Sequence, residues 1–130
     1  MYKRQRLNYT RIDAQVLTDE KGLFFIIEQV LSNALKYTKE GGTVSIYLEA
    51  PKTLCIQDTG IGIAAEDLPR IFECGYTGLN GRRDKKASGI GLYLCSRIAK
   101  QLGHTLSVDA QIGVGTVVRI GLARKDVRLE

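Results

Sequence analysis

The strongest periodic pattern along the chain is an apolar stripe between residues 23 and 35. Apolar side chains recur there every three or four residues, which is the period of an amphipathic helix that packs one face on a core. Asp19 precedes the stripe as an N-cap, and Glu40-Gly41-Gly42 follows it as a C-cap and turn. We therefore predict a helix over 20–38, with core positions Leu23, Ile26, Ile27, Val30, Leu31, Ala34 and Leu35.

A second apolar stripe predicts a helix over 89–102, and Gly103 stands where a left-handed C-cap belongs. Residues 64–68 fit a shorter helix that Pro69 would stop. Alternating apolar and polar residues predict strands at 7–16, 43–49, 53–57, 105–109 and 116–122. The second and third strands form a hairpin, and 111–115 is the turn before the last strand. Together these elements predict an α/β (α+β) two-layer sandwich, in which a mixed sheet of about five strands packs on about three helices.

Residues 73–88 follow neither period. Their glycines and the basic run 82–86 offer little apolar surface to bury. A structureless stretch of this length inside a compact domain is typical of a functional lid or a disordered insert. We interpret it as a lid.

Composition narrows the class of protein. With 130 residues, 44% apolar and 25% charged, the chain is an ordinary globular domain, and it contains neither a membrane-length apolar run nor a signal peptide. The odd number of cysteines suits a reducing compartment and argues against a disulfide scaffold or a zinc site. Cys55 and Cys95 fall in apolar patterns and are predicted to be core residues. The net charge of +5 lies mostly near the start and in 82–86, without interleaved aromatics, so nucleic acid is not the expected partner.

The candidate chemistry begins at Asp58, directly behind the apolar run 54–56. The sequence Asp58-Thr-Gly-Ile-Gly62 predicts a carboxylate at a strand end, followed by a turn with little side-chain bulk. Such a backbone admits a flat ligand, with Asp58 as acceptor for a ligand N–H. The same residues are also typical of an ordinary loop turn.

Two further stretches carry polar chemistry. Gln29, Asn33, Lys36 and Tyr37 share one helix face, which is either a solvated face or a binding face. The glycine pair Gly89 and Gly91 opens a helix, where free N–H groups and the dipole favour an anion.

Five motifs stand in one order along the chain: Asn33-Ala-Leu-Lys-Tyr37, Asp58-Thr-Gly-Ile-Gly62, Ile71-Phe72, Gly89-Ile-Gly-Leu92 and Gly113-Val-Gly-Thr116. They resemble the N box, first glycine box, F box and second and third glycine boxes of the ATP-binding catalytic domain of bacterial sensor histidine kinases. That domain has the Bergerat-type fold shared with DNA gyrase, Hsp90 and the mismatch-repair protein MutL. The resemblance covers residues 8 to 122. The lid and Gly89-Ile-Gly-Leu-Tyr-Leu94 are similar to the small Gram-positive sensor kinases that respond to peptide antibiotics.

The resemblance implies a role for each motif residue. Asn33 would bind Mg²⁺ and Lys36 would meet the phosphates of ATP. Arg82, or its neighbour Arg83, would be the lid cation that neutralises the γ-phosphoryl charge. Backbone N–H groups for the phosphates would come from Gly89, Gly91 and Leu92.

At the other end of the nucleotide, the resemblance implies that Asp58 accepts a hydrogen bond from the adenine amine. Tyr37 would pack by the adenine or ribose, and Thr116 would add a hydroxyl, directly or through water. The base pocket would be lined by Gly60, Gly62 and Ile63.

Two departures from the family pattern matter. Position 29 is Gln, whereas a Glu activates water in the relatives that hydrolyse ATP. Because an amide cannot take a proton, we expect phosphoryl transfer rather than fast hydrolysis. The family phosphorylates a histidine on a separate N-terminal dimerisation domain, and this chain has only His104, which we interpret as a turn residue.

The chain is therefore expected to be a single catalytic domain (core 7–122, lid 73–88) of a longer histidine kinase whose dimerisation domain is absent. Its partners would be that histidine-bearing domain and a downstream response regulator. The fragment would be monomeric and cytoplasmic, and its parent would lie in the bacterial cell membrane.

Two alternatives change the function. A same-fold serine kinase, or a nucleotide-binding module without histidine transfer, would keep every glycine motif. A short-chain dehydrogenase fragment would explain the glycines of 87–92, with Asp109 as the ribose-binding acid. That fingerprint must follow a buried strand, whereas the basic run 82–86 precedes it here, and too few residues follow for a dinucleotide fold.

Overall fold

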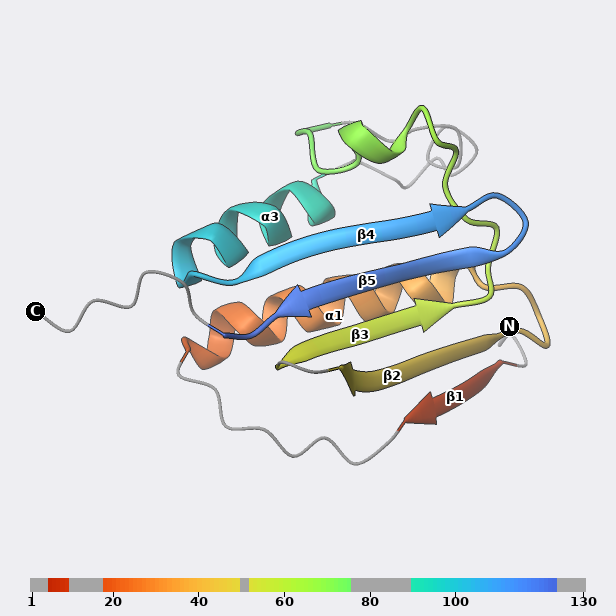
Figure 1. Ribbon diagram of the computed structural model, residues 1–130, viewed down its shortest axis with the longest axis horizontal. Helices are drawn as coiled ribbons and strands as arrows, with labels where there is room; N and C mark the ends of the chain where they lie inside the picture. The colour runs from red at the N-terminus through yellow and green to blue at the C-terminus, as the bar shows by residue number, and fades with distance from the viewer. Residues whose placement is uncertain (1–4, 10–17, 50–51, 76–89, 124–130) are drawn as a thin grey trace, which may run out of the picture.

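The chain forms one mixed β-sheet with helices on one face. The computed structural model describes residues 5–9, 18–49, 52–75 and 90–123. Figure 1 shows the sheet in front, with α1 and α3 behind it. The elements are β1 (Arg6–Tyr9), α1 (Glu20–Tyr37), β2 (Thr43–Glu49), β3 (Thr53–Asp58), the 3-10 helix η1 (Leu68–Arg70), α3 (Gly91–Leu102), β4 (Thr105–Gln111) and β5 (Gly115–Gly121).

The described sheet has five strands in the order β1-β2-β3-β5-β4. β1 pairs with β2 in parallel, and all other neighbours are antiparallel. The register aligns Val44 of β2 with Asp58, and Asp58 in turn with Thr116 of β5. The end of β3 therefore lies beside the start of β5, where the third glycine motif ends.

The core lies between the sheet and the two α-helices. The buried stripes of α1 and α3 face the apolar side chains of the strands, and this burial stabilises helices that would be marginal in isolation. The buried residues of this cluster are Ile26, Val30, Ala34, Val44, Leu54, Ile56, Cys95, Ala99, Val118, Ile120 and Leu122.

The helix caps predicted at Asp19 and Gly103 are confirmed, whereas the C-cap predicted at 40–42 is wrong, because α1 ends at Tyr37 and its C-cap residue is Thr38. The carboxylate of Asp19 accepts a hydrogen bond of 3.1 Å from a backbone N–H in the first turn of α1. Gly103 follows α3 with a left-handed φ of 78°. The N–H groups of Gly103 and His104 donate to carbonyls of the last turn at 3.2 and 2.9 Å, which is a Schellman arrangement.

The structure confirms the sandwich and the mixed five-stranded sheet, and it corrects some local predictions. The helix predicted over 64–68 is wrong, because the backbone there only makes a turn, in which the Ala64 carbonyl accepts from the N–H groups of Asp67 and Leu68. The 3-10 helix begins at Leu68 instead. Pro69 lies in its first turn, where the missing N–H has no consequence.

The prediction that Leu35 faces the core is also wrong, since this residue is 37% exposed. Only positions spaced four residues apart along α1 are fully buried, so the core-facing stripe is narrower than the sequence pattern. The first strand is described over Arg6–Tyr9, and the rest of predicted strand 7–16 lies outside the described residues. Most of predicted lid 73–88 lies outside them as well.

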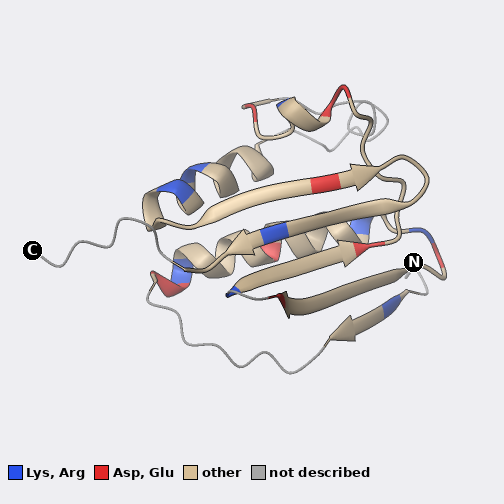
Figure 2. Ribbon diagram, viewed as in Figure 1, with Lys and Arg blue, Asp and Glu red and all other residues tan. Residues whose placement is uncertain are grey.

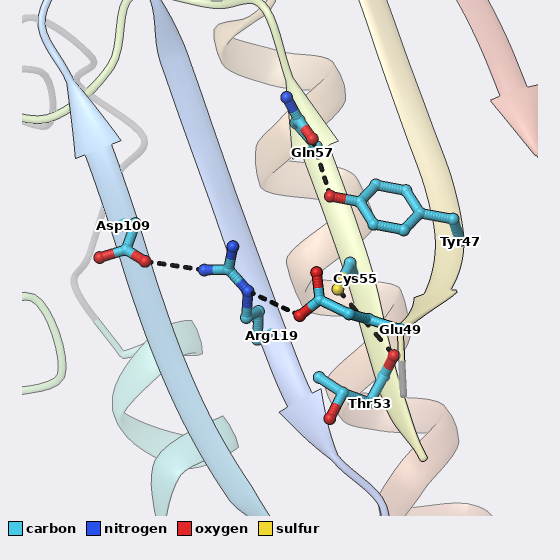
Figure 3. Close-up of polar contacts among 7 residues, drawn as sticks. All are labelled: Tyr47, Glu49, Thr53, Cys55, Gln57, Asp109 and Arg119. Carbon is cyan, nitrogen blue, oxygen red and sulfur yellow. Dashed lines mark hydrogen bonds and ion pairs between the residues drawn. The ribbon is translucent and has the colours of Figure 1, made fainter. Parts of the chain in front are cut away.

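The sheet face opposite the helices carries a polar cluster over Cys55 (Figure 3). Arg119 bridges Asp109 at 2.7 Å and Glu49 at 3.4 Å, and Figure 2 shows acidic and basic residues on neighbouring strands of this face. Cys55 is fully buried as predicted, but beneath this cluster rather than against the helices. Burial raises the thiol pKa of Cys55, and that of Cys95 to about 11, so both thiols stay protonated at neutral pH.

The loop after β3 is wedged between α1 and the β4–β5 turn. A Cβ on Gly60 would collide with the carbonyl of Tyr37, and one on Gly62 with the backbone of the β4–β5 turn. Ile61 joins both sides, since its N–H donates to Tyr37 at 3.4 Å and its carbonyl accepts from Gly113 at 3.0 Å. The two glycine positions are thus fixed by contacts within the protein's own backbone.

Replacing Gly62 by Ala is expected to lower the free energy of unfolding by about 3 kcal/mol, because the new Cβ meets backbone and the φ of 76° is left-handed. Gly41 is a matched control, with a φ of 80° but nothing within 4 Å of a built Cβ. Gly41→Ala should therefore cost only about 1 kcal/mol. Urea denaturation measures both, and equal losses would contradict the wedge.

Candidate functional site

The carboxylate of Asp58 ends β3 in a buried position, where the residue is 8% exposed. Its Oδ1 accepts a hydrogen bond from the Gly60 N–H at 2.8 Å, and the backbone of Thr116 donates a second one. Burial raises the pKa of Asp58, and these two hydrogen bonds oppose the rise. They fix the orientation of the carboxylate and leave it acceptor capacity for a ligand donor.

The polar face of α1 lies between this loop and the start of α3. The Oε1 of Gln29 lies so near Gly91 that a Cβ on that glycine would approach it to 2.7 Å, and the Tyr37 carbonyl touches Gly60. Positions 29, 33 and 37 lie in a row along the helix, which places Asn33 between the two contacts. Asn33 is half-buried there, as are Gln29 and Tyr37.

Lys36 lies on the same end of α1 and is exposed. Its Nζ lies 5.4 Å from the centroid of the Tyr37 ring, within cation–π distance. A positive charge thus lies in the last turn of α1, one helical turn beyond Asn33.

The start of α3 supplies backbone donors without a side-chain cap. The N-cap residue is Ile90, whose apolar side chain makes no capping hydrogen bond to the first turn. The first N–H groups of a helix lack partners within the helix, and the dipole's positive end favours an anion. Gly91 and Leu92 occupy this first turn, and both are half-buried.

Hydrogen bonds and close contacts thus connect three of the predicted motifs to one another and bring a fourth against α1. Asp58 contacts Thr116 and the glycine loop, this loop contacts Tyr37, and Gln29 contacts Gly91. Figure 1 shows the end of α1, the arrowhead of β3 and the β4–β5 turn at the same end of the molecule. Ile63 follows the glycine loop and is half-buried. Three predicted residues lie outside the described part, namely Arg82, Arg83 and Gly89.

The donor set for a metal is sparse. The described segments contain no group of three or more His, Cys, Asp or Glu that could hold a metal ion. The amide oxygen of Asn33 is a hard donor of the kind that Mg²⁺ accepts. These residues fit a magnesium ion that arrives with a phosphate ligand, which would supply further oxygens, and they do not fit a metal held by protein alone.

His104 has a structural position. It is 5% exposed, and its Nε2 shares a hydrogen bond of 2.7 Å with the Thr18 hydroxyl. Together with its backbone role after α3, this agrees with its interpretation as a turn residue.

Two residues that hold the site were given no role by the sequence patterns. Thr59 pins the glycine loop to β2, because its Oγ1 accepts from the Thr43 N–H at 2.9 Å and its own N–H donates to the Thr43 carbonyl at 3.0 Å. Gln5 donates to the carbonyls of Leu35 and Thr38 at the end of α1. Both partners are distant in sequence, so no local pattern could indicate them.

The family model described as histidine kinase-, DNA gyrase B- and HSP90-like ATPase matches residues 18–126. The sensor histidine kinase YxdK of Bacillus subtilis is 38% identical over 117 residues, covering 87% of this chain and 36% of YxdK. The sensor protein kinase GraS of Staphylococcus aureus is 43% identical over 113 residues, covering 85% of this chain and 32% of GraS. The chain thus spans about a third of the length of these relatives.

Solved structures agree with this family. A mycobacterial sensor histidine kinase, MprB, superposes with a TM-score of 0.80 at 29% identity, covering 90% of this chain and 82% of that one. Full-length ShkA, solved in complex with AMPPNP, gives 0.72 at 26% identity, covering 96% of this chain and 27% of that one. The catalytic domain of histidine kinase ThkA gives 0.72 at 21% identity, with 89% and 76% covered, and shares the fold.

The dehydrogenase alternative is wrong. Asp109 is a surface residue on the helix-free face of the sheet, paired with Arg119, and the element described before α3 is η1 rather than a buried strand. The order of motifs and the described sheet agree with the family model, which matches residues 18–126. The chain belongs to the family of histidine kinase-, DNA gyrase B- and HSP90-like ATPases, and the relatives named above to which it is similar are sensor histidine kinases.

Proposed function

We propose that the chain binds Mg-ATP and transfers the γ-phosphoryl group to a histidine on a separate dimerisation domain, as the catalytic part of a two-component sensor histidine kinase. The observation that carries this proposal is the set of contacts linking Asp58, the Asn33 face of α1 and the start of α3. An adenine acceptor, a metal ligand and phosphate donors are the groups that this nucleotide requires. Membership of the family supports the same conclusion.

In this proposal, β3 and the glycine loop that follows it bind the adenine base of ATP. Asp58 accepts a hydrogen bond from the exocyclic amine, because its carboxylate is already oriented by two backbone donors. Tyr37 packs by the adenine or ribose, and Thr116 adds a hydroxyl. The base is lined by Gly60, Gly62 and Ile63.

The triphosphate lies along the polar face of α1 toward α3. Magnesium, when bound with the nucleotide, neutralises charge on the phosphates. Asn33 holds it through the amide oxygen, and Lys36 pairs with the phosphates. Backbone donors come from Gly89, Gly91 and Leu92, and the lid cation is Arg82 or Arg83.

Gln29 favours transfer over hydrolysis. Its amide lies against the start of α3, close to where the phosphates would bind, yet it cannot accept a proton from water. A neutral side chain there leaves water without a general base while the protein acceptor approaches.

The phosphoacceptor is a histidine outside this chain, since His104 is buried and hydrogen-bonded. The partners are therefore the dimerisation domain of the parent kinase and a response regulator. None of the helices in the described segments is long and apolar enough to cross a membrane. We place this domain, as a monomer, in the cytoplasm and its parent in the bacterial cell membrane.

Phosphoryl transfer tests the proposal directly. The chain is incubated with a histidine-bearing dimerisation domain and labelled Mg-ATP, and the labelled product is treated with acid and with alkali. We expect a label that acid removes and alkali leaves, as for phosphohistidine. The reverse stability would indicate a serine kinase, and nucleotide binding without any label would indicate a binding module.

Replacing Asp58 by Asn is expected to weaken ADP binding about tenfold or more, because a neutral amide is a weaker acceptor than a carboxylate. A fluorescent-nucleotide titration measures the loss. Asp109→Asn, the same change on the other face of the sheet, should leave binding unchanged. Wild-type affinity in the Asp58 variant would contradict the adenine contact.

The same variant should unfold at a temperature at least as high as the wild type. Burial raises the pKa of Asp58, so the folded state favours the neutral form. In the wild type, the free energy of unfolding that protonated Asp58 contributes is fully present below the ordinary aspartate pKa. It is lost as the pH rises through the raised pKa of the folded state. Thermal scans should therefore show a gap between variant and wild type at neutral pH that closes in acid. A gap that widens in acid would contradict the sign of the shift.

Replacing Asn33 by Ala is expected to lower Mg²⁺-dependent transfer about a hundredfold, because a metal ligand is lost, while metal-free ADP binding changes little. Ser32→Ala, on the exposed side of the same helix, is the matched control. Transfer assays and calorimetry separate the two effects. Equal losses in both would contradict a metal role.

A further inference from the structure

Helix α1 ends without a glycine cap. It stops at Tyr37, and the C-cap residue Thr38 has an extended backbone with φ −88° and ψ 131°. The carbonyls of a last helical turn have no N–H partners within the helix. Thr38 itself is 0% exposed, whereas Leu35 and Lys36 just before it are exposed. The buried polar groups at Thr38 therefore need partners from elsewhere in the chain.

Partners from three segments meet these carbonyls. The Thr38 hydroxyl donates back to Ala34, and the Ile61 N–H of the glycine loop donates to Tyr37. A third donor is the side-chain amide of Gln5. Its Nε2 donates to the Leu35 carbonyl at 2.8 Å and to the Thr38 carbonyl at 2.7 Å.

The chemistry of Gln5 is well matched to this position. Both partners are carbonyl oxygens, which only accept, so the amide nitrogen with its two hydrogens must face them. The C-terminal end of a helix also carries partial negative charge, which a donor stabilises and a carboxylate would oppose.

The end of α1 that Gln5 holds is the end that carries the site. Lys36 and Tyr37 belong to the last turn, and the Tyr37 carbonyl is in contact with Gly60 of the glycine loop. A shift of this turn would move the loop behind Asp58 as well. Gln5 thus acts on the site indirectly, because it holds the end of α1, which in turn contacts the glycine loop.

Gln5 also precedes the most exposed strand of the described sheet. All four residues of β1 are exposed, and it forms an edge of the described sheet beside β2 (Figure 1). Next to Gln5, the Arg6 N–H donates a hydrogen bond of 2.9 Å to the Gly42 carbonyl, which also holds the start of β1 in place. With so little apolar burial, hydrogen bonds decide how firmly this strand is held.

We propose that Gln5 is a positioning residue for the nucleotide site, and that it couples the attachment of β1 to nucleotide binding. The inference rests on the proposed function, because the ligand is the adenine nucleotide. Coupling between two equilibria is reciprocal: if holding the end of α1 favours binding, nucleotide must tighten β1 in return.

The test is calorimetric titration of ADP into the wild type and two variants. Gln5→Glu keeps the size of the side chain but has no donor at neutral pH, and we expect its Kd to rise about tenfold, which is about 1.4 kcal/mol. Gln5→Lys restores a donor with a charge that suits a helix C-terminus, and its Kd should stay within about twofold of the wild type. Circular dichroism at the titration temperature confirms that each variant is folded.

Gln57→Glu is the matched control. It is the same substitution on β3, and it keeps the acceptor for the Tyr47 hydroxyl, which lies 2.8 Å away on the helix-free face (Figure 3). Its Kd should be unchanged. Wild-type affinity in Gln5→Glu, or equal losses in Gln5→Glu and Gln5→Lys, would overturn the positioning role.

Hydrogen exchange of the wild type provides a readout that needs no variant. Saturating ADP should slow exchange of the Arg6 amide several-fold, whereas a merely structural Gln5 would leave it unchanged. If the wild type binds ADP without this slowing, only the coupling fails. If it binds no ADP at all, the proposed function fails with it.

Discussion

The organisation of this domain depends on the close approach of three backbone segments at the end of β3. The glycine loop passes between the carbonyl of Tyr37 and the β4–β5 turn, at distances that no Cβ permits. Because Ile61 is hydrogen-bonded on both sides, the positions of α1, β3 and β5 are fixed relative to one another. Asp58 stands one residue before the loop, so its carboxylate inherits that rigidity. A site built on close-packed backbone needs little from flexible side chains to keep its shape.

The same arrangement has an energetic cost at Asp58. The carboxylate is buried, and its raised pKa shows that two backbone hydrogen bonds do not fully offset desolvation. A carboxylate retained in such a place is typical of a binding function rather than of stability. The polar cluster around Arg119 differs, because those charges are partly or largely exposed and pair with one another. The charged positions lie on different strands of the sheet (Figure 2).

Much of the fold was predictable because local patterns agreed with tertiary packing. The stripe of α1, the cap at Asp19, the hairpin ending at Asp58 and the left-handed Gly103 each follow from neighbours within a few residues. The wrong predictions lie where the local sequence allows more than one structure and tertiary packing determines which one forms. Pro69 begins a 3-10 turn instead of ending a helix, and Leu35 lies at the edge of a narrow stripe. The site residues came from short motifs that each predicted one chemical group.

The sequence by itself determined which groups this protein offers: one carboxylate after a strand, amides on a helix face and bare N–H groups at a second helix. Only the tertiary structure decided how they are held. Gln5 and Thr59 contact partners far away in the chain, and the glycines of Asp58-Thr-Gly-Ile-Gly62 serve backbone packing that no local pattern reveals. Local patterns record interactions between near neighbours, whereas these contacts arise only when segments distant in sequence are brought together by burial of a common core.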